Sequence, residues 1–358
     1  MRIKHFLPIV GFGLAALSLS AQAALSFSTF VTGSSLSTVL SNNATIGFAY
    51  AGDKFIGSVY FGTDNNQLYS TDLTGGSVHT FGTPISGFSG EIYVTASLGI
   101  GGYGSRDVFA GSEAGGSVVR ISHDGTSQSV FVSSGISGGV RSIAFDPYGA
   151  YGNQMIVATN SGNIYKVSNA GTATLLASVG EDTEGLSFAP QGFGSYAAGT
   201  LFVASEGSGT LRAISPAGTV STVLTGLSGA EMVSFVPLNL GSSGSSVEGF
   251  YAAAYPNDVQ KASASQFTSF LGDAIITSET GHQVWQVHYN GSSFVTSVVG
   301  TFPAQPEDGI FVTADIINPP VPEPSTYALM FAGLAAIYFT MRGRARGRAA
   351  RFNGTLAA

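Results

Sequence analysis

Apolar and polar residues alternate in a recurring pattern between residues 48 and 316. Three segments show the pattern most clearly, and in each of them β-branched or aromatic residues alternate with polar ones, which is the period of a β-strand. No segment between the two chain ends has the i, i+3, i+4 apolar spacing of a long helix. The three segments are DVFAGSEAGGSVVRISHDGTSQSVFV from Asp107, QMIVATNSGNIYKVSNAGTATLLA from Gln154 and TLFVASEGSGTLRAISPAGTVSTVL from Thr200, and weaker copies begin at Ser58 and Asp273.

Each repeat is built from four predicted strands. The second and third strands of the clear copies are followed by polar turns, and a further strand that ends in an aromatic residue and proline precedes several copies, at Pro147, Pro190 and Pro237. Four strands in about 47 residues are typical of one blade of a β-propeller. A glycine that supplies the positive φ of a tight hairpin stands at the same turn in four copies: Asp124-Gly125, Ala170-Gly171, Ala217-Gly218 and Asn290-Gly291.

The spacing of the copies sets the number of blades. Equivalent positions are 49, 47, 46 and 73 residues apart, and the longest interval contains one more strand, Gly249 to Tyr255, which is either a compressed blade or a long insertion. About 300 residues divided by 47 gives just over six. We therefore expect an all-β fold, a six-bladed β-propeller, with five blades as the alternative. A β-sandwich would not repeat its sequence, and a parallel β-helix repeats at about half this period or less. The equivalent positions are Val59, Val108, Met155, Leu201 and Ala274.

Composition excludes several classes of protein. The chain has 358 residues, of which 49 are Gly and only 10% are charged, and 44% are apolar, so wholesale disorder is not expected. The absence of Cys excludes disulfides, thiolate metal sites and a cysteine nucleophile. Seven of the 14 basic residues lie at the ends, which leaves the middle with a net charge of about −13. A nucleic-acid partner is therefore not expected.

The N-terminal residues 1–23 have the three parts of a secretory signal peptide. Arg2 and Lys4 form the positive region, Phe6 to Leu19 is apolar, and Ala21 and Ala23 form an A-x-A cleavage site for signal peptidase. The apolar run has 14 residues, fewer than the ~20 that span a membrane. We expect cleavage after Ala23, with a propeller domain over residues 24–318.

The C-terminal end has another three-part order. A Pro-rich linker at 319–324 precedes an apolar run that ends at Met341, and arginines follow it. We expect a transmembrane helix over 325–341, and a basic tail over 342–358 that the positive-inside rule keeps in the cytoplasm.

This end closely resembles the PEP-CTERM sorting signal of Gram-negative bacteria, in which Pro-Glu-Pro precedes a short membrane helix and a basic tail. The matching residues are Pro322, Glu323 and Pro324, followed by the Ser-Thr pair and the arginine cluster. The resemblance implies cleavage by an exosortase-type membrane protease, export through the inner membrane, transient anchoring, and a final place at the cell surface or outside the cell. An ordinary tail anchor is the alternative, and the tail runs past the arginines, where family members usually stop.

The blade pattern resembles the NHL-like and SMP-30/gluconolactonase-like six-bladed propellers over about 260 residues. That likeness concerns architecture and carries no function by itself. SMP-30-type lactonases hold a divalent metal in the channel, but of their ligand set only Glu184 has a possible counterpart in this chain.

Candidate chemistry gathers at the start of the innermost predicted strands. Aligning those strands places Arg141, Glu184 and Glu231 in one column, to which the strand DGIFV adds Asp308. Three carboxylates from separate blades are typical ligands of Ca²⁺ or another divalent cation, and Arg141 is a candidate binding residue at the same channel mouth. A paired acid and base acting on a lactone or sugar is a second use. The alternative is that these carboxylates are solvated or bond to backbone N–H groups.

A second acidic column follows the second strand of each blade. Because it recurs in nearly every blade, we interpret it as structural, with the side chains bonding to turn backbone. The turn around Glu181 and Asp182 is interpreted as solvated, and the single Trp285 as core packing. The column contains Asp64, Glu113, Asn160, Glu206 and Glu279.

The sequence thus favours an exported binding or structural protein associated with the envelope or with extracellular polysaccharide. A metal-dependent lactonase-like hydrolase that uses the channel mouth is the alternative. A protein-interaction scaffold is a third hypothesis, which the sequence does not distinguish from the binding protein.

Overall fold

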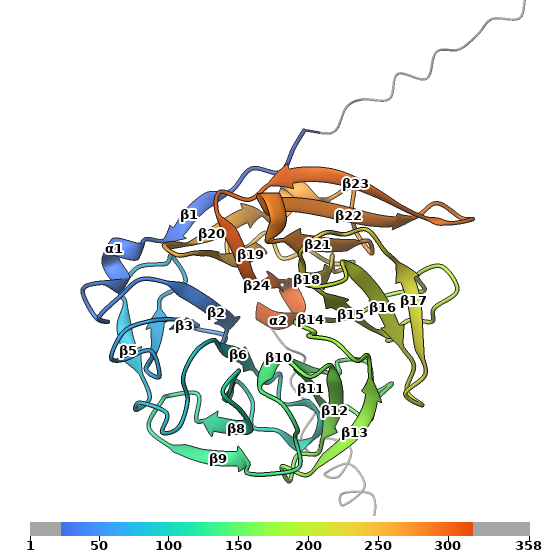
Figure 1. The fold of residues 1–358 in the computed structure, drawn as a ribbon. Coiled ribbons are helices and arrows are strands. Elements are labelled where there is room, and N and C mark those ends of the chain that lie inside the picture. Colours follow the sequence, from blue (N-terminus) through green and yellow to red (C-terminus); the bar gives the residue numbers. More distant parts are fainter. Residues whose placement is uncertain (1–22, 318–358) are drawn as a thin grey trace, which may run out of the picture.

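The computed structural model describes residues 23–317, which form six four-stranded antiparallel sheets around a central axis (Figure 1). The predicted six-bladed propeller is confirmed, and the five-bladed alternative is wrong. The predicted signal peptide, linker, transmembrane helix and basic tail lie outside the described residues. Among residues 23–317, no helix is long and apolar enough to cross a membrane.

Four blades follow the chain in order from the innermost strand to the outermost. The hairpin glycines anticipated from sequence have positive φ angles, 76° at Gly125 and 84° at Gly218. The first blade contains β2 (Thr45–Tyr50), β3 (Phe55–Val59), β4 (Leu68–Thr71) and β5 (His79–Phe81), and the second contains β6 (Ile92–Ala96), β7 (Val108–Ser112), β8 (Gly115–Ile121) and β9 (Gln128–Val132). The third contains β10 (Val140–Phe145), β11 (Met155–Thr159), β12 (Asn163–Val167) and β13 (Ala173–Ser178), and the fourth contains β14 (Gly185–Phe188), β15 (Leu201–Ser205), β16 (Thr210–Ile214) and β17 (Val220–Leu224).

The last two blades are interleaved. The fifth contains β18 (Ala230–Phe235), β21 (Ala274–Ser278), β22 (Gln283–Tyr289) and β23 (Phe294–Thr301), and the sixth contains β24 (Gln305–Val312), β19 (Gly249–Tyr255), β20 (Asp258–Ser263) and β1 (Ser28–Val31). Between β18 and β21 the chain leaves the fifth blade and forms the β19–β20 hairpin of its neighbour. The 73-residue interval is therefore a long insertion, and the N-terminal β1 closes the ring as the outer edge of the sixth blade.

The helices are single turns in the connections. They are α1 (Gly33–Leu36), α2 (Ala314–Ile317) and the 3₁₀ turns η1 (Ile100–Gly102), η2 (Ala264–Phe267) and η3 (Thr280–His282). Of these, α2 lies at the centre of the ring (Figure 1).

Apolar side chains between neighbouring sheets form the core. Phe193, Phe202 and Phe235 pack between the fourth and fifth blades with ring centroids 5.0–5.6 Å apart. Full burial of one such ring contributes roughly 2–3 kcal/mol. Trp285 is partly buried against the same cluster, in agreement with the packing role expected for it.

Two tyrosines make the same kind of link between neighbouring blades, one from the second blade to the third and one from the third to the fourth. The hydroxyl of Tyr103 accepts from the N–H of Met155 at 2.9 Å and donates to the carbonyl of Val167 at 2.5 Å. The hydroxyl of Tyr151 makes the same pair of bonds one blade further on, with the N–H of Leu201 and the carbonyl of Ile214. These buried bonds fix the angle between adjacent sheets.

Candidate functional site

One mouth of the channel is lined by acidic side chains around a single guanidinium. Arg141, the second residue of β10, forms ion pairs with Glu91 and Glu184, which immediately precede β6 and β14. The same guanidinium lies 3.3 Å from Glu113 and 3.4 Å from Asp182. Strands from three blades thus bring one cation and four carboxylates together, as the alignment of Arg141 with Glu184 indicated.

Tyr93 ties two of these carboxylates together. Its fully buried hydroxyl lies 2.7 Å from Glu184 and 3.0 Å from Glu91. With Arg141 on the other side, both carboxylates have hydrogen-bond partners. This half of the site is compensated by the protein itself.

Glu231 is not compensated in this way. It is the second residue of β18, its side chain is 0% exposed, and neither carboxylate oxygen has a hydrogen-bond partner among the described residues. One of its oxygens lies within 4.8 Å of carboxylate oxygens of Glu184 and Glu206, and a second such group joins it to Glu279 and Glu307. A buried charge without a partner is strongly unfavourable, so this arrangement calls for a proton or a cation.

Burial shifts the acid–base behaviour of these groups. Desolvation, reinforced by the neighbouring carboxylates, raises the pKa of Glu231 and of Glu307 well above their usual range. Desolvation also raises the pKa of Glu91 to about 7, against the opposing effect of the Tyr93 hydroxyl. The pKa of Glu206 is raised by burial and by Glu279.

Asp308 does not join this cluster, contrary to the expectation from sequence, and Glu307 takes its place. Asp308 lies at a β-bulge between β24 and β19 with a φ of 35°, and its carboxylate accepts a hydrogen bond from the N–H of Phe48 at 3.1 Å. Desolvation raises its pKa to about 7. The sequence contains a signal that would have corrected this alignment. Glu231 stands four residues before Phe235 and Glu307 stands four before Phe311, so aligning the strands on their phenylalanines pairs Glu307 with Glu231.

The second acidic column divides into two groups. Asp64, Glu113 and Asn160 accept hydrogen bonds from backbone N–H groups of the loop that precedes the inner strand of their own blade, in agreement with a structural role. Glu206 and Glu279 instead lie beside Glu231, and the amide of Gln305 donates to Glu279 at 2.6 Å and to Glu307 at 2.8 Å. The structural interpretation therefore misses these two residues.

The acidic turn beside this mouth is satisfied by the protein. Glu181 pairs with Arg212 and accepts from the hydroxyl of Ser208 at 2.8 Å. It therefore offers no free carboxylate to the cluster.

The residues present fit a divalent cation. Two ligands that each lie about 2.4 Å from Ca²⁺ are at most about 4.8 Å apart, and the oxygens of each glutamate group meet that limit. Glu184, Glu206 and Glu231 come from the fourth and fifth blades, and Glu231, Glu279 and Glu307 come from the fifth and sixth, so an ion held by either group would join two sheets. Candidate ligands are Glu184, Glu206, Glu231, Glu279 and Glu307.

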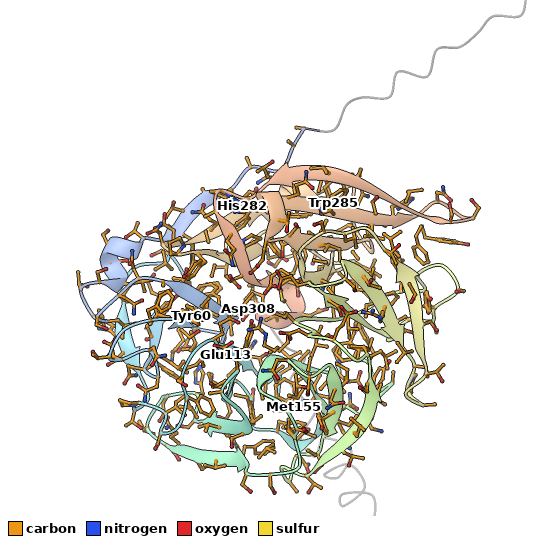
Figure 2. The ribbon with its side chains drawn as sticks, viewed as in Figure 1. Tyr60, Glu113, Met155, His282, Trp285 and Asp308 are labelled. Carbon is orange, nitrogen blue, oxygen red and sulfur yellow. The ribbon has the colours of Figure 1, made fainter. Side chains whose placement is uncertain are left out.

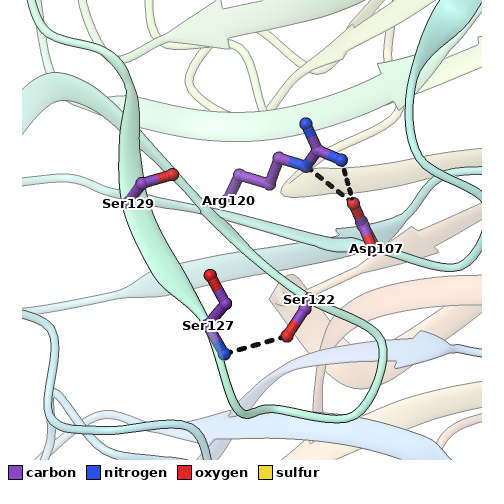
Figure 3. A pocket seen from close by; sticks show the side chains of 5 residues that line it. All are labelled: Asp107, Arg120, Ser122, Ser127 and Ser129. Carbon is purple, nitrogen blue, oxygen red and sulfur yellow. Dashed lines mark hydrogen bonds and ion pairs between the residues drawn. The ribbon is translucent and has the colours of Figure 1, made fainter.

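Two cavities lie away from this cluster. The larger has a volume of about 720 Å³, lies at the opposite mouth and is lined in part by Asp308. Tyr60 and Glu113 instead belong to the acidic mouth. Figure 2 labels all three residues, which lie toward the middle of the ring. A smaller cavity of about 290 Å³ lies beside the outer strands of the second blade, where Arg120 pairs with Asp107 (Figure 3). Neither cavity contains a glutamate cluster.

A closed ring of six sheets with a carboxylate cluster at one mouth defines the class, a six-bladed β-propeller with a candidate cation site. Residues 320–345 match the PEP-CTERM protein-sorting motif. The chain is thus an exported protein that is transiently anchored in the membrane before it reaches the surface or the extracellular space, and an exosortase recognises its motif.

Comparison with solved structures finds matches of low sequence identity. They include a chain of the nidogen/laminin complex (TM-score 0.49, 15% identity, covering 74% of this chain and 83% of the other) and a structure described as a gluconolactonase (0.49, 12%, 78% and 83%). A third is the PQQ-bound aldose sugar dehydrogenase of Streptomyces coelicolor (0.49, 14%, 85% and 96%). No curated protein matches the sequence. No activity passes to this chain from similarities of this size.

Proposed function

We propose that this exported propeller binds a divalent cation, Ca²⁺ in the first instance, at its acidic mouth and uses that site to bind envelope or extracellular polysaccharide. The observation that carries the proposal is Glu231, a fully buried carboxylate with no partner among the described residues. Arg141 neutralises Glu91 and Glu184, and no basic side chain forms an ion pair with Glu231, Glu279 or Glu307 in residues 23–317. A cation supplies the missing charge.

Aromatic side chains beside the acidic mouth support a carbohydrate ligand. The rings of Tyr60 and Phe61 lie 4.2 Å apart, and that of Tyr255 lies 6.1 Å from Tyr60. Burial raises the pKa of Tyr60 and the charges of Glu113 and Glu91 raise it further, so this group adjoins the carboxylates. Phe61 is 53% exposed. Sugar hydroxyls can complete the oxygen shell of Ca²⁺ while the apolar face of a sugar ring packs on an exposed aromatic side chain.

A metal-dependent lactonase-like hydrolase is the second candidate. Glu91 favours it, because its pKa of about 7 lets the carboxyl take up or release a proton near neutral pH. Its side chain is partly exposed, at 17%, and therefore accessible to water. In that case the cation would polarise the carbonyl and Glu91 would move the proton.

Calorimetric titration of Ca²⁺ and Mg²⁺ into the protein tests the cation site. We expect heat and a rise in melting temperature for the natural sequence, and neither for Glu231→Gln. Absence of any effect on the natural sequence would end both candidate functions.

Binding of the producing organism's own polysaccharide, with Ca²⁺ and then with a chelator, tests the ligand. We expect binding that is lost on chelation and weakened in Phe61→Ala. Leu175→Ala is the matched control, because Leu175 is 55% exposed on the outer strand β13. Hydrolysis of simple lactones that depends on the metal and is lost in Glu91→Gln would favour the hydrolase instead.

A further inference from the structure

The mouth opposite the carboxylate cluster is apolar. Its cavity of about 720 Å³ is lined by the ends of the inner strands and the residues after them, including Phe235 and Pro237. Three large apolar or aromatic side chains on its rim are exposed: Ile100 by 37%, Tyr148 by 51% and Leu238 by 47%. They come from loops of the second, third and fifth blades, so the apolar rim surrounds the mouth on several sides.

The described chain ends at this same mouth. Asp315 and Ile316 of α2 line the cavity, and the guanidinium of Arg106 donates to the carbonyl of Ile316. The helix occupies the centre of the ring (Figure 1). The chain that follows Ile317 therefore starts from the middle of the apolar face.

Little chain separates that point from the predicted membrane segment. Eight residues lead from Ile317 to Ser325, which is at most about 28 Å of extended chain. The sorting motif itself begins at residue 320. While the protein is anchored, this mouth must therefore remain near the bilayer.

The arrangement of acidic groups favours the same orientation. The carboxylates around Arg141 and Glu231 lie at the other mouth, away from the anionic lipids that would repel them, whereas the acidic side chains lining the apolar mouth are the exposed Asp315 and the buried Asp308. Tyr148 has the amphipathic ring that is enriched at the level of lipid headgroups, and Ile100 and Leu238 provide apolar contact.

We infer that the apolar mouth docks on the bilayer in the anchored form, with Ile100, Tyr148 and Leu238 at the headgroup level and the carboxylate cluster facing away. Three half-exposed side chains bind a bilayer weakly by themselves, so the short linker supplies the effective concentration. Cleavage of the linker then releases the propeller from the surface. This inference is independent of the proposed cation site.

The natural sequence contains no Cys, so a single introduced cysteine can carry a unique fluorescent label. Three full-length variants are reconstituted in phosphatidylethanolamine/phosphatidylglycerol vesicles: Tyr148→Cys, Leu238→Cys and Phe61→Cys. Phe61 is the matched control, because it is exposed to nearly the same extent as Tyr148 but lies beside the acidic mouth. Fluorescence of the single Trp285 verifies that each variant is folded.

Lipids that carry a quencher near the headgroup should quench labels at 148 and 238 severalfold more strongly than the label at 61. Adding Leu238→Asp should reduce quenching at 148, whereas Leu175→Asp on an outer strand should not. Equal quenching at all three positions, or stronger quenching at 61, would overturn the inference. Absence of Ca²⁺ binding by the natural protein or by Glu231→Gln would refute the proposed cation site but has no bearing on this result.

Discussion

Replacing Glu231 with Gln is the most direct test of the interpretation of the acidic mouth. The substitution keeps the size of the side chain and removes the ability to carry a charge. Glu231 is fully buried and unpartnered, so in the absence of a cation it must stay protonated or be a buried charge. Either state destabilises the fold at neutral pH. We therefore expect Glu231→Gln to stabilise the cation-free protein, against the usual direction of a core substitution.

The magnitude follows from the protonation equilibrium. An ordinary glutamate has a pKa of 4.5, and holding one protonated costs about 1.4 kcal/mol for each pH unit above that value. At pH 7 the cost is about 3 kcal/mol, and at pH 5 it falls below about 1 kcal/mol. A change of about 3 kcal/mol in a domain of this size moves the melting temperature by roughly 5 °C.

Differential scanning calorimetry with a chelator, at pH 5 and pH 7, measures the effect. Glu248→Gln is the matched control, because Glu248 is equally buried but accepts hydrogen bonds from the N–H groups of Gly241 and Ser243 and from the Ser243 hydroxyl. That variant loses charge-assisted bonds and should be destabilised. Added Ca²⁺ should raise the melting temperature of the natural protein and leave that of Glu231→Gln unchanged.

The reasoning fails if Glu231→Gln lowers the melting temperature at pH 7 without a cation. It also fails if the two glutamate variants change stability in the same direction. In either case the carboxylate is satisfied in some way that the described residues do not supply.

Three further predictions concern the same fold. Arg141→Gln leaves Glu91 and Glu184 without the guanidinium that pairs with them, so the free energy of unfolding measured in urea should fall by about 3 kcal/mol at pH 8. The loss should be smaller at pH 5, because Glu91 is protonated there, and an equal loss at both pH values would contradict this. The pKa of Glu91 and that of Asp308 are raised to about 7, so between pH 4.5 and 7 the folded state keeps protons that the unfolded chain has released. The cation-free protein should therefore lose stability as the pH rises from about 4.5 to 7, and a melting temperature that rises over that range would exclude this linkage. Tyr151→Phe leaves the N–H of Leu201 and the carbonyl of Ile214 unpaired and should cost about 1–3 kcal/mol in urea unfolding, whereas no measurable change would show that the link between blades is not needed.

Much of the fold could be predicted because a blade is a local unit. Strand periodicity, hairpin glycines and the aromatic–proline strand ends all lie within about 47 residues, and together they predict the third and fourth sheets strand by strand. The interleaving of the last two blades could not be predicted in the same way. Nothing near Gly249–Tyr255 shows that this strand pairs with β24, because the pairing depends on where β18 and β21 lie in the ring.

The candidate site was only partly predictable. Arg141, Glu184 and Glu231 stand at one position of the inner strand, and periodicity placed them together. The bulge in β24 shifts the register by one residue, so the choice between Glu307 and Asp308 depended on local backbone geometry. Glu206 and Glu279 lie in a column that is structural in other blades, and only their approach to Glu231 distinguishes them.

The sixth blade draws its strands from three separate stretches of chain, which sets the order in which the exported molecule can mature. The first strand to emerge from translocation, β1, has its partner 233 residues later, at Ser28 and Lys261. Its edge stays open throughout that interval, when it is free to pair with the wrong chain. The innermost strand of the same blade ends at Val312, only eight residues before the sorting motif begins. The ring therefore becomes complete only when the chain has been exported almost as far as the sorting motif. A protease that acts at the motif thus encounters a propeller whose last strand has already emerged.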